Sequence, residues 1–216
     1  MRHDFHRGVE LQSWALEHAL SPMAAPPDDW PLTFRLPGSH LAPLKQGDYA
    51  VAHSAAFAAV NAFRLVSVEQ QRLSRADEYA LLSAAWRWQE DRGETHFMRG
   101  LRGSDWPRLV ECLHETLSRR QHLHINVSQP WRQRQPVISE FLSAIERFLV
   151  ARHVVVGLFM GAHYSVIRGF TPASLLLFDS GGQCSVRRRC LGLVGEAHRL
   201  RHHLVASSTL TLRRSS

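Results

Sequence analysis

Two side chains in a predicted hairpin could carry out acid–base chemistry. Residues 163–169 and 174–179 read as strands, and a turn at residues 170–173 joins them. If the turn centres on Thr171, His163 lies directly opposite Asp179 on one face, with the Cβ atoms about 5 Å apart. A carboxylate in that place holds the imidazole tautomer and stabilises the charged ring, as a general base requires. A surface histidine beside a turn aspartate is the alternative interpretation.

A candidate nucleophile begins the most apolar segment of the chain. Residues 54–66 are rich in alanine and nearly uncharged, which predicts a buried central helix that begins at Ser54. The positive end of the helix dipole stabilises a developing anion at that position. Ser54 could instead serve as a helix cap. Gln46, eight residues upstream, could donate its amide to an oxyanion, or could be a solvated loop residue.

The combination of these residues resembles the papain-like cysteine peptidases. It consists of Gln46-Gly47, the small-residue helix 54–62, the motif His163-Tyr164-Ser165-Val166-Ile167-Arg168-Gly169-Phe170 and the motif Leu177-Phe178-Asp179-Ser180. It is most similar to the bacterial branch that includes the bacteriocin-processing leader peptidases. The resemblance covers about residues 46–64 and 154–180. It implies an oxyanion donor at Gln46, a nucleophile at the start of the central helix, a base at His163 and an orienting Asp179. It also implies a peptide or protein substrate and no cofactor.

The sequence departs from this family at the nucleophile. The ungapped helix match puts Ser54 where the family has its cysteine, whereas counting from Gln46 by the family's usual spacing reaches Ala52. We favour Ser54, because a loop accepts a two-residue insertion more readily than a buried helix does. A serine in a site tuned for a thiolate predicts low activity. An engineered knockout, a natural pseudo-peptidase and a serine-using hydrolase all fit the sequence.

Other chemical groups give weaker signals. Cys112 falls on the apolar side of a predicted helix, and Cys184 and Cys190 flank an arginine run, so none is the expected nucleophile. The pairs His122/His124 and His198/His202 have spacings that could bind a metal, but 14 histidines make such spacings common, and no metal site is predicted. The net charge of +7 and the run 187–189 permit nucleic-acid binding, but no recognition motif accompanies them.

The remaining patterns predict an α+β fold of papain-like type, in which an N-terminal helical layer with a central buried helix packs on a C-terminal antiparallel sheet. Residues 1–45 are expected to form a partly proline-rich arm, which begins with a short helix at 9–20 and continues as a proline-rich passage without regular structure, and residues 46–216 a single domain. Its helical part is 46–152 and its sheet part 153–214. Further helices are predicted at 74–89, 105–120 and 136–152, with Ser74–Asp77 in capping-box spacing and Ser104 as a candidate cap. Further strands are predicted at 123–127, 154–160, 184–190 and 205–212.

These observations lead to one functional expectation and one alternative. We expect a papain-like, bacterial thiol-protease-type hydrolase that transfers an acyl group from a peptide or isopeptide bond, with low activity. The alternative is a pseudoenzyme that binds a peptide or protein in the same cleft. Deamidase or transglutaminase chemistry would use the same residues. The 216-residue chain has no apolar run of about 20 residues and no secretory signal pattern, so a cytoplasmic protein without membrane insertion is expected.

Overall fold

In the computed structural model the described residues are 29–46, 53–69, 71–92, 101, 105–121, 123–159, 163–195 and 201–215. The predicted helix at 9–20, the candidate cap Ser104 and the alternative nucleophile position Ala52 lie outside them. The described part is a mixed α+β structure, as the sequence predicts. Among its helices, none is long and apolar enough to cross a lipid bilayer.

The helical elements follow the predicted segments closely. They are α2 (Ser54–Ser67), α3 (Arg75–Glu90), α5 (Trp106–Gln121) and α6 (Ile138–Val150). The capping box forms as expected: the Ser74 hydroxyl accepts from the Asp77 backbone N–H, and the Asp77 carboxylate accepts from the Ser74 backbone N–H. A helix start of this kind can be read from four residues, because the whole interaction is local.

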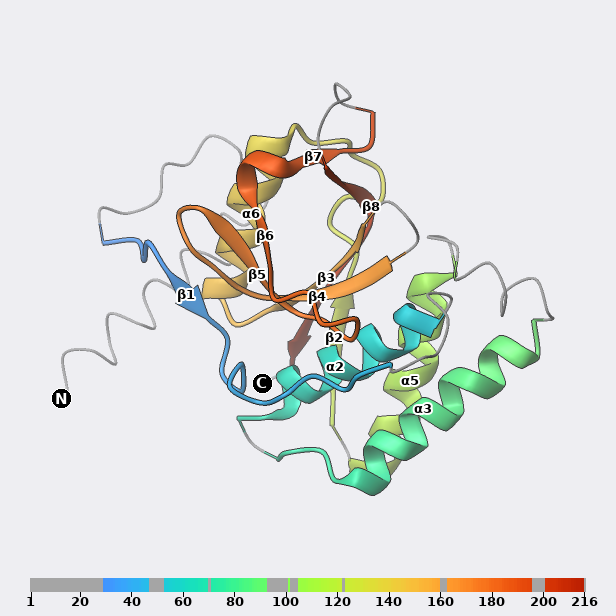
Figure 1. The fold of residues 1–216 in the computed structure, drawn as a ribbon. Helices are drawn as coiled ribbons and strands as arrows, with labels where there is room; N and C mark the ends of the chain where they lie inside the picture. The colour runs from blue at the N-terminus through green and yellow to red at the C-terminus, as the bar shows by residue number, and fades with distance from the viewer. Residues whose placement is uncertain are drawn as a thin grey trace, which may run out of the picture.

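An eight-stranded sheet packs against these helices (Figure 1). Its main path runs β2-β8-β3-β4-β5-β6, with antiparallel neighbours throughout. Off this path, β1 pairs antiparallel with β4, and β7 pairs parallel with β8. The strands are β1 (Phe34–Arg35), β2 (Ile125–Ser128), β3 (Val154–Phe159), β4 (His163–Phe170), β5 (Ser174–Phe178), β6 (Ser185–Arg187), β7 (Leu191–Leu193) and β8 (His202–Arg214).

The central helix α2 is the contact between the two layers. It packs on β3, β4 and β8 on one side and on α3 and α5 on the other, while α6 lies across the sheet from them (Figure 1). Thirteen of its 14 residues are buried, which explains why its sequence lacks the polar face of a surface helix. Small residues such as Ala55, Ala58 and Ala59 let the neighbouring elements approach this helix closely on all sides.

Two predictions about the sheet need correction. The N-terminal arm contributes β1, which lies beside the end of β4, so part of the proline-rich passage is regular structure. The predicted strand at 184–190 divides into β6, a 3₁₀ turn at Arg188–Cys190 and the separate strand β7. Arg188 begins this turn, and its backbone N–H donates to the carbonyl of Ala173 (2.9 Å). Contacts of this kind link distant parts of the chain, so the local pattern does not encode them.

The register of the β4–β5 hairpin also differs from the predicted one. The turn runs from Thr171 to Ser174, with mutual backbone hydrogen bonds between these two residues, and Pro172 is its first central residue. Ile167 pairs with Leu177, not with the residue expected from a turn centred on Thr171. Arg168 is an extra residue on β4, where the pairing shifts between Ile167 and Gly169. The true register places Asp179 two residues away from the predicted position.

Candidate functional site

The imidazole of His163 and the carboxylate of Asp179 form the centre of the site. His163 is the first residue of β4, and Asp179 directly follows β5. The two-residue register difference preserves the face to which each side chain points, so the imidazole of His163 and the carboxylate of Asp179 still meet. His163 Nε2 lies 2.6 Å from Asp179 Oδ1. Because Nε2 faces the carboxylate, Nδ1 is the ring nitrogen left for proton transfer to another group.

Asp179 is the buried member of this pair. Its side chain is 1% exposed, whereas that of His163 is 25% exposed. Burial opposes ionisation of Asp179, but the hydrogen bond and charge of His163 and the backbone N–H of Gln183 outweigh it and hold the pKa of the carboxyl below its usual value. The Gln183 N–H lies 3.1 Å from Asp179 Oδ2. The aspartate is therefore an anion at neutral pH, able to stabilise an imidazolium.

The tight turn after β5 lies directly against the carboxylate of Asp179. The backbone N–H of Gly182 donates to the carbonyl of Asp179 at 3.4 Å, and Gly182 has a φ of +97°. At Gly181 a Cβ would lie 3.1 Å from Asp179 Oδ2 and 3.5 Å from His163 Cε1. The two glycines let the backbone turn directly against the pair, so that the loop after β5 forms one wall of the site.

Gln46 reaches the same loop from the N-terminal arm. Its side-chain Oε1 accepts a hydrogen bond from the Ser180 hydroxyl (2.9 Å), and its backbone N–H donates to the Ser180 carbonyl (3.3 Å). Gln46 is 8% exposed and Ser180 is 3% exposed. Since Oε1 is engaged, the amide Nε2 is the group that Gln46 can offer to a ligand. Ser180, which follows Asp179 directly, therefore couples the position of Gln46 to that of the carboxylate.

Ser54 lies at the end of the sheet where β5 stops. The last β4–β5 pair at this end is Val166 with Phe178, so the β4 residues before Val166 have no β5 partner. The backbone N–H of Tyr164 donates instead to Ser54 Oγ at 3.2 Å. Ser54 is 1% exposed. The residue before it, His53, is the N-cap of α2 and makes no side-chain cap hydrogen bond. Ser54 is thus not the helix cap of the alternative interpretation; its hydroxyl joins the start of α2 to the strand that carries His163.

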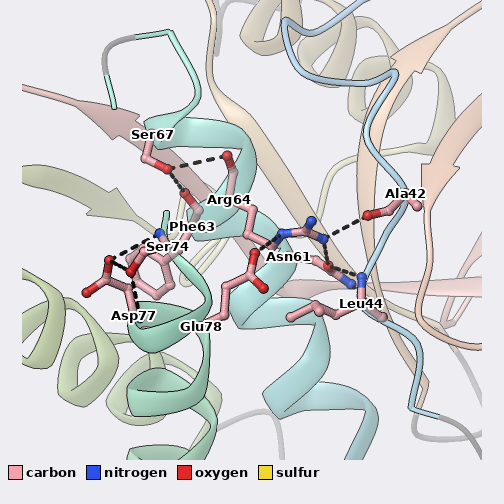
Figure 2. A network of polar contacts seen from close by, with 9 residues as sticks. All are labelled: Ala42, Leu44, Asn61, Phe63, Arg64, Ser67, Ser74, Asp77 and Glu78. Carbon is pink, nitrogen blue, oxygen red and sulfur yellow. Dashed lines mark hydrogen bonds and ion pairs between the residues drawn. The ribbon is translucent and has the colours of Figure 1, made fainter. Parts of the chain in front are cut away.

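A polar network from α2 fixes the arm that ends at Gln46 (Figure 2). Asn61 Oδ1 accepts from the Leu44 backbone N–H at 2.8 Å, and Asn61 Nδ2 donates to the Leu44 carbonyl at 3.2 Å. Arg64 donates through Nη1 to the Ala42 carbonyl at 2.8 Å. The Arg64 guanidinium also pairs with the carboxylate of Glu78 on α3 at 2.7 Å. The central helix thereby contacts the site and the arm at two places, Ser54 at its start and Asn61 about two turns later.

The structure therefore links the four predicted residues by a path of hydrogen bonds and sequence neighbours. It runs from Gln46 through Ser180 to Asp179 and His163, and from the neighbouring Tyr164 to Ser54. Ser180 is the last residue of one of the sequence motifs, but the sequence pattern predicts no role for it. Its position directly after the carboxylate residue was the available signal.

Asn61 and Arg64 were missed for a different reason. Both lie in segment 54–66, whose composition predicts an apolar helix, and both are buried, at 0% and 8% exposure. A polar residue in an otherwise apolar helix needs a partner, and this was a signal that some other segment must supply one.

The three cysteines, His124 and His202 are not among the contacts of this site. Cys112 is on α5, where burial, reinforced by the charge of Glu115, raises the pKa of its thiol. Cys184 is exposed, and Cys190 is half-buried. His122 and His198, one member of each predicted histidine pair, lie outside the described residues. Within the described ranges, no three His, Cys, Asp or Glu side chains are grouped as metal ligands.

Comparison of the chain with models of known protein families, with curated proteins and with solved structures finds no match.

Proposed function

We propose that this domain is a papain-like amide hydrolase scaffold with weak activity, in which Ser54 occupies the nucleophile position. The observation that supports this most strongly is the 2.6 Å contact between His163 Nε2 and Asp179 Oδ1, at the same end of the sheet as Ser54 and Gln46. A base with its orienting carboxylate, a hydroxyl at a helix start and an amide donor are the groups that acyl transfer requires.

The proposed reaction uses these groups in two steps. Ser54 Oγ attacks the carbonyl carbon of a peptide or isopeptide bond as its proton passes to His163 Nδ1, and Gln46 Nε2 stabilises the oxyanion. The C–N bond then breaks, the amine leaves with the proton from His163, and an ester to Ser54 remains. Water, deprotonated by His163, hydrolyses the ester and returns the hydroxyl to Ser54. Asp179 stabilises the imidazolium in both steps.

A second candidate function is peptide or protein binding without chemistry. The observation that favours it is the state of Ser54, which is 1% exposed and accepts the backbone hydrogen bond of Tyr164. An alcohol held in this way is a poor nucleophile, because its lone pair is engaged and a substrate carbonyl must displace neighbouring atoms to reach it. The same residues would then serve for recognition alone.

The experiment that tests the proposed site measures the pH dependence of alkylation in a Ser54→Cys variant. Iodoacetamide labelling between pH 5 and 9, resolved by peptide mass spectrometry, reports each thiol separately, with Cys112 and Cys184 as internal references. We expect the introduced thiol to react well below pH 7, because imidazolium at His163 and the helix start stabilise the thiolate. Addition of His163→Ala should return its profile to that of an ordinary thiol.

Ser67→Cys is the matched control, because Ser67 lies on the same helix and is also 1% exposed, but at the opposite end. Its labelling should be indifferent to His163→Ala. If the thiol introduced at Ser54 behaves in the same way, Ser54 is not in a catalytic site; an Ala52→Cys variant then tests the alternative register. Labelling of the unaltered chain by a fluorophosphonate probe at Ser54 supports a hydrolase, whereas an unlabelled Ser54 beside an ionised Ser54→Cys thiol supports the binding module.

A further inference from the structure

A groove lies between the start of α5, the edge strand β2 and the middle of β8. It consists of three adjoining cavities of about 630, 490 and 390 Å³, and Arg132 lines all three. Pro107 at the first turn of α5 borders two of the cavities. None of the residues proposed for acyl transfer lines these cavities, so the groove is separate from that site.

An irregularity in β8 forms one side of the groove. Leu210 pairs with Val156 and Val205 pairs with Leu158, so residues 206–209 of β8 face a single residue of β3. The displaced segment exposes Ser207, whose carbonyl accepts a hydrogen bond from the Gln129 side chain. The bulge therefore moves β8 out of the flat sheet and toward the turn that follows β2.

The groove carries an excess of positive charge. Arg108 and Arg132 line it, and neither forms an ion pair in the described part of the chain. Arg134, in the third cavity, is neutralised by Glu140 at 3.0 Å. Glu111 is the acidic residue of the lining. A ligand with several carboxylates gains from the two arginines, and a hydroxyl or amide of the same ligand can face Glu111.

The outer edge of β2 offers backbone groups to the same groove. The N–H of Ile125 points away from β8, because it donates to His114 Nε2 at 3.1 Å. The carbonyl of His124 points toward β8, since it accepts from the N–H of Ser215 at 3.0 Å. Strand alternation then directs the N–H and C=O of Val127 outward, where Val127 lines the second cavity. An edge strand with outward backbone groups is a template for an added strand.

We propose that this groove binds an extended, carboxylate-bearing peptide segment of a partner protein, which adds to the edge of β2 at Val127 and places its acidic side chains against Arg108 and Arg132. At Ile125 the backbone N–H is already bound by His114 Nε2, so the added strand does not pair there. Burial lowers the pKa of the His114 imidazole, which favours the neutral form that accepts this hydrogen bond. The inference is independent of the acyl-transfer proposal, because it uses different residues and requires no reaction.

The lining favours a peptide over a nucleic acid. The lining includes the large aromatic ring of Trp131, but this residue is only 3% exposed. The centroid of its ring lies 4.4 Å from that of Phe141. Trp131 therefore offers no surface on which a base can stack. Instead, the outward backbone groups of Val127 match the backbone of an added strand, and Arg108 and Arg132 match its acidic side chains.

Fluorescence anisotropy with labelled decapeptides tests the proposal on the full chain. The probes are an alternating Glu–Val peptide, a Ser–Val peptide, a Lys–Val peptide and a Glu–Val peptide with proline at two central valines. We expect the Glu–Val peptide to bind at least tenfold more tightly than the other three, because charge and a continuous strand backbone are both required. A ten-residue oligothymidylate is the nucleic-acid probe.

The protein variants compare charge in the groove with charge elsewhere. The double variant Arg108→Ala/Arg132→Ala should weaken binding of the Glu–Val peptide about tenfold or more. The matched double variant Arg35→Ala/Arg187→Ala, which removes two exposed arginines on β1 and β6, should change it less than twofold. Equal losses in the two double variants, equal binding of the proline peptide, tighter binding of the oligothymidylate or no measurable binding of the Glu–Val peptide would each overturn the proposal.

Discussion

Replacement of Asn61 by alanine tests how the N-terminal arm is held against the central helix. Asn61 is fully buried and makes two hydrogen bonds to the backbone of Leu44, of 2.8 Å and 3.2 Å (Figure 2). Its Oδ1 also accepts from Arg64 Nη1 at 3.3 Å. Alanine keeps the helix, because it has the highest helix propensity, but removes all three contacts. The change therefore acts on the arm rather than on α2 itself.

The magnitude follows from these contacts. Each of the two backbone hydrogen bonds contributes roughly 1 kcal/mol net, and a buried group left without a partner costs about 1–3 kcal/mol. Leu44 is only half-buried, so water can reach its N–H and C=O if the arm lifts, which lowers this second cost. We expect Asn61→Ala to reduce the free energy of unfolding by about 2–4 kcal/mol. For a chain of this size that corresponds to a fall in Tm of roughly 5–15 °C.

Urea denaturation followed by tryptophan fluorescence measures this change, with thermal melting as a second measurement. Asn126→Ala is the matched control, because Asn126 is exposed on β2, and it should cost less than about 0.5 kcal/mol. Asn61→Asp keeps the acceptor for the Leu44 N–H but loses the donor, so its effect should be intermediate. A loss for Asn61→Ala no greater than for Asn126→Ala would refute the anchoring role of Asn61.

Two further predictions concern stability. Burial and the charge of Arg213 lower the pKa of His153 from its usual 6.5 to about 4. This group therefore destabilises the fold increasingly as pH falls below about 6.5, by roughly 3 kcal/mol at pH 4, and the effect levels off below that. In urea titrations at pH 7 and pH 5, His153→Phe should remove most of this decline; parallel declines in the two proteins would contradict it. At Gly169 a Cβ would lie 2.2 Å from the carbonyl oxygen of Phe34. Gly169→Ala should therefore displace β1 and reduce the free energy of unfolding by about 1–3 kcal/mol, and a loss below about 0.5 kcal/mol would show that β1 adds little.

The parts of the fold that the sequence predicted well are those set by local interactions. The Ser74–Asp77 capping box and the alanine-rich run that begins at Ser54 each define a helix start within a few residues. The hairpin register was predicted less well, because it depends on which residues occupy the turn and on the extra residue Arg168. The parallel pairing of β7 with β8 has no local signal, since the strands meet only after the chain has folded.

The candidate site shows the same division. His163 and Asp179 are 16 positions apart in one hairpin, so strand alternation was enough to bring them together. The contact of Ser54 with Tyr164 spans 110 positions, and that of Gln46 with Ser180 spans 134. Their proximity followed from resemblance to a known arrangement, but the specific atoms in contact required the packed structure. Consequently the hydrogen bond that engages the Ser54 hydroxyl was not predictable from the sequence.

The extra residue at Arg168 determines how the hairpin tolerates changes in length. Continued from the pair Gly169–Leu176 without the bulge, the register would set Asp179 opposite Val166, on the face away from His163. With the bulge, Asp179 shares the face of His163. Loss or gain of one residue between the turn and the site therefore separates the pair, whereas a change of two residues preserves the shared face. Between the turn and the site, only length changes of an even number of residues therefore keep Asp179 on the face of His163.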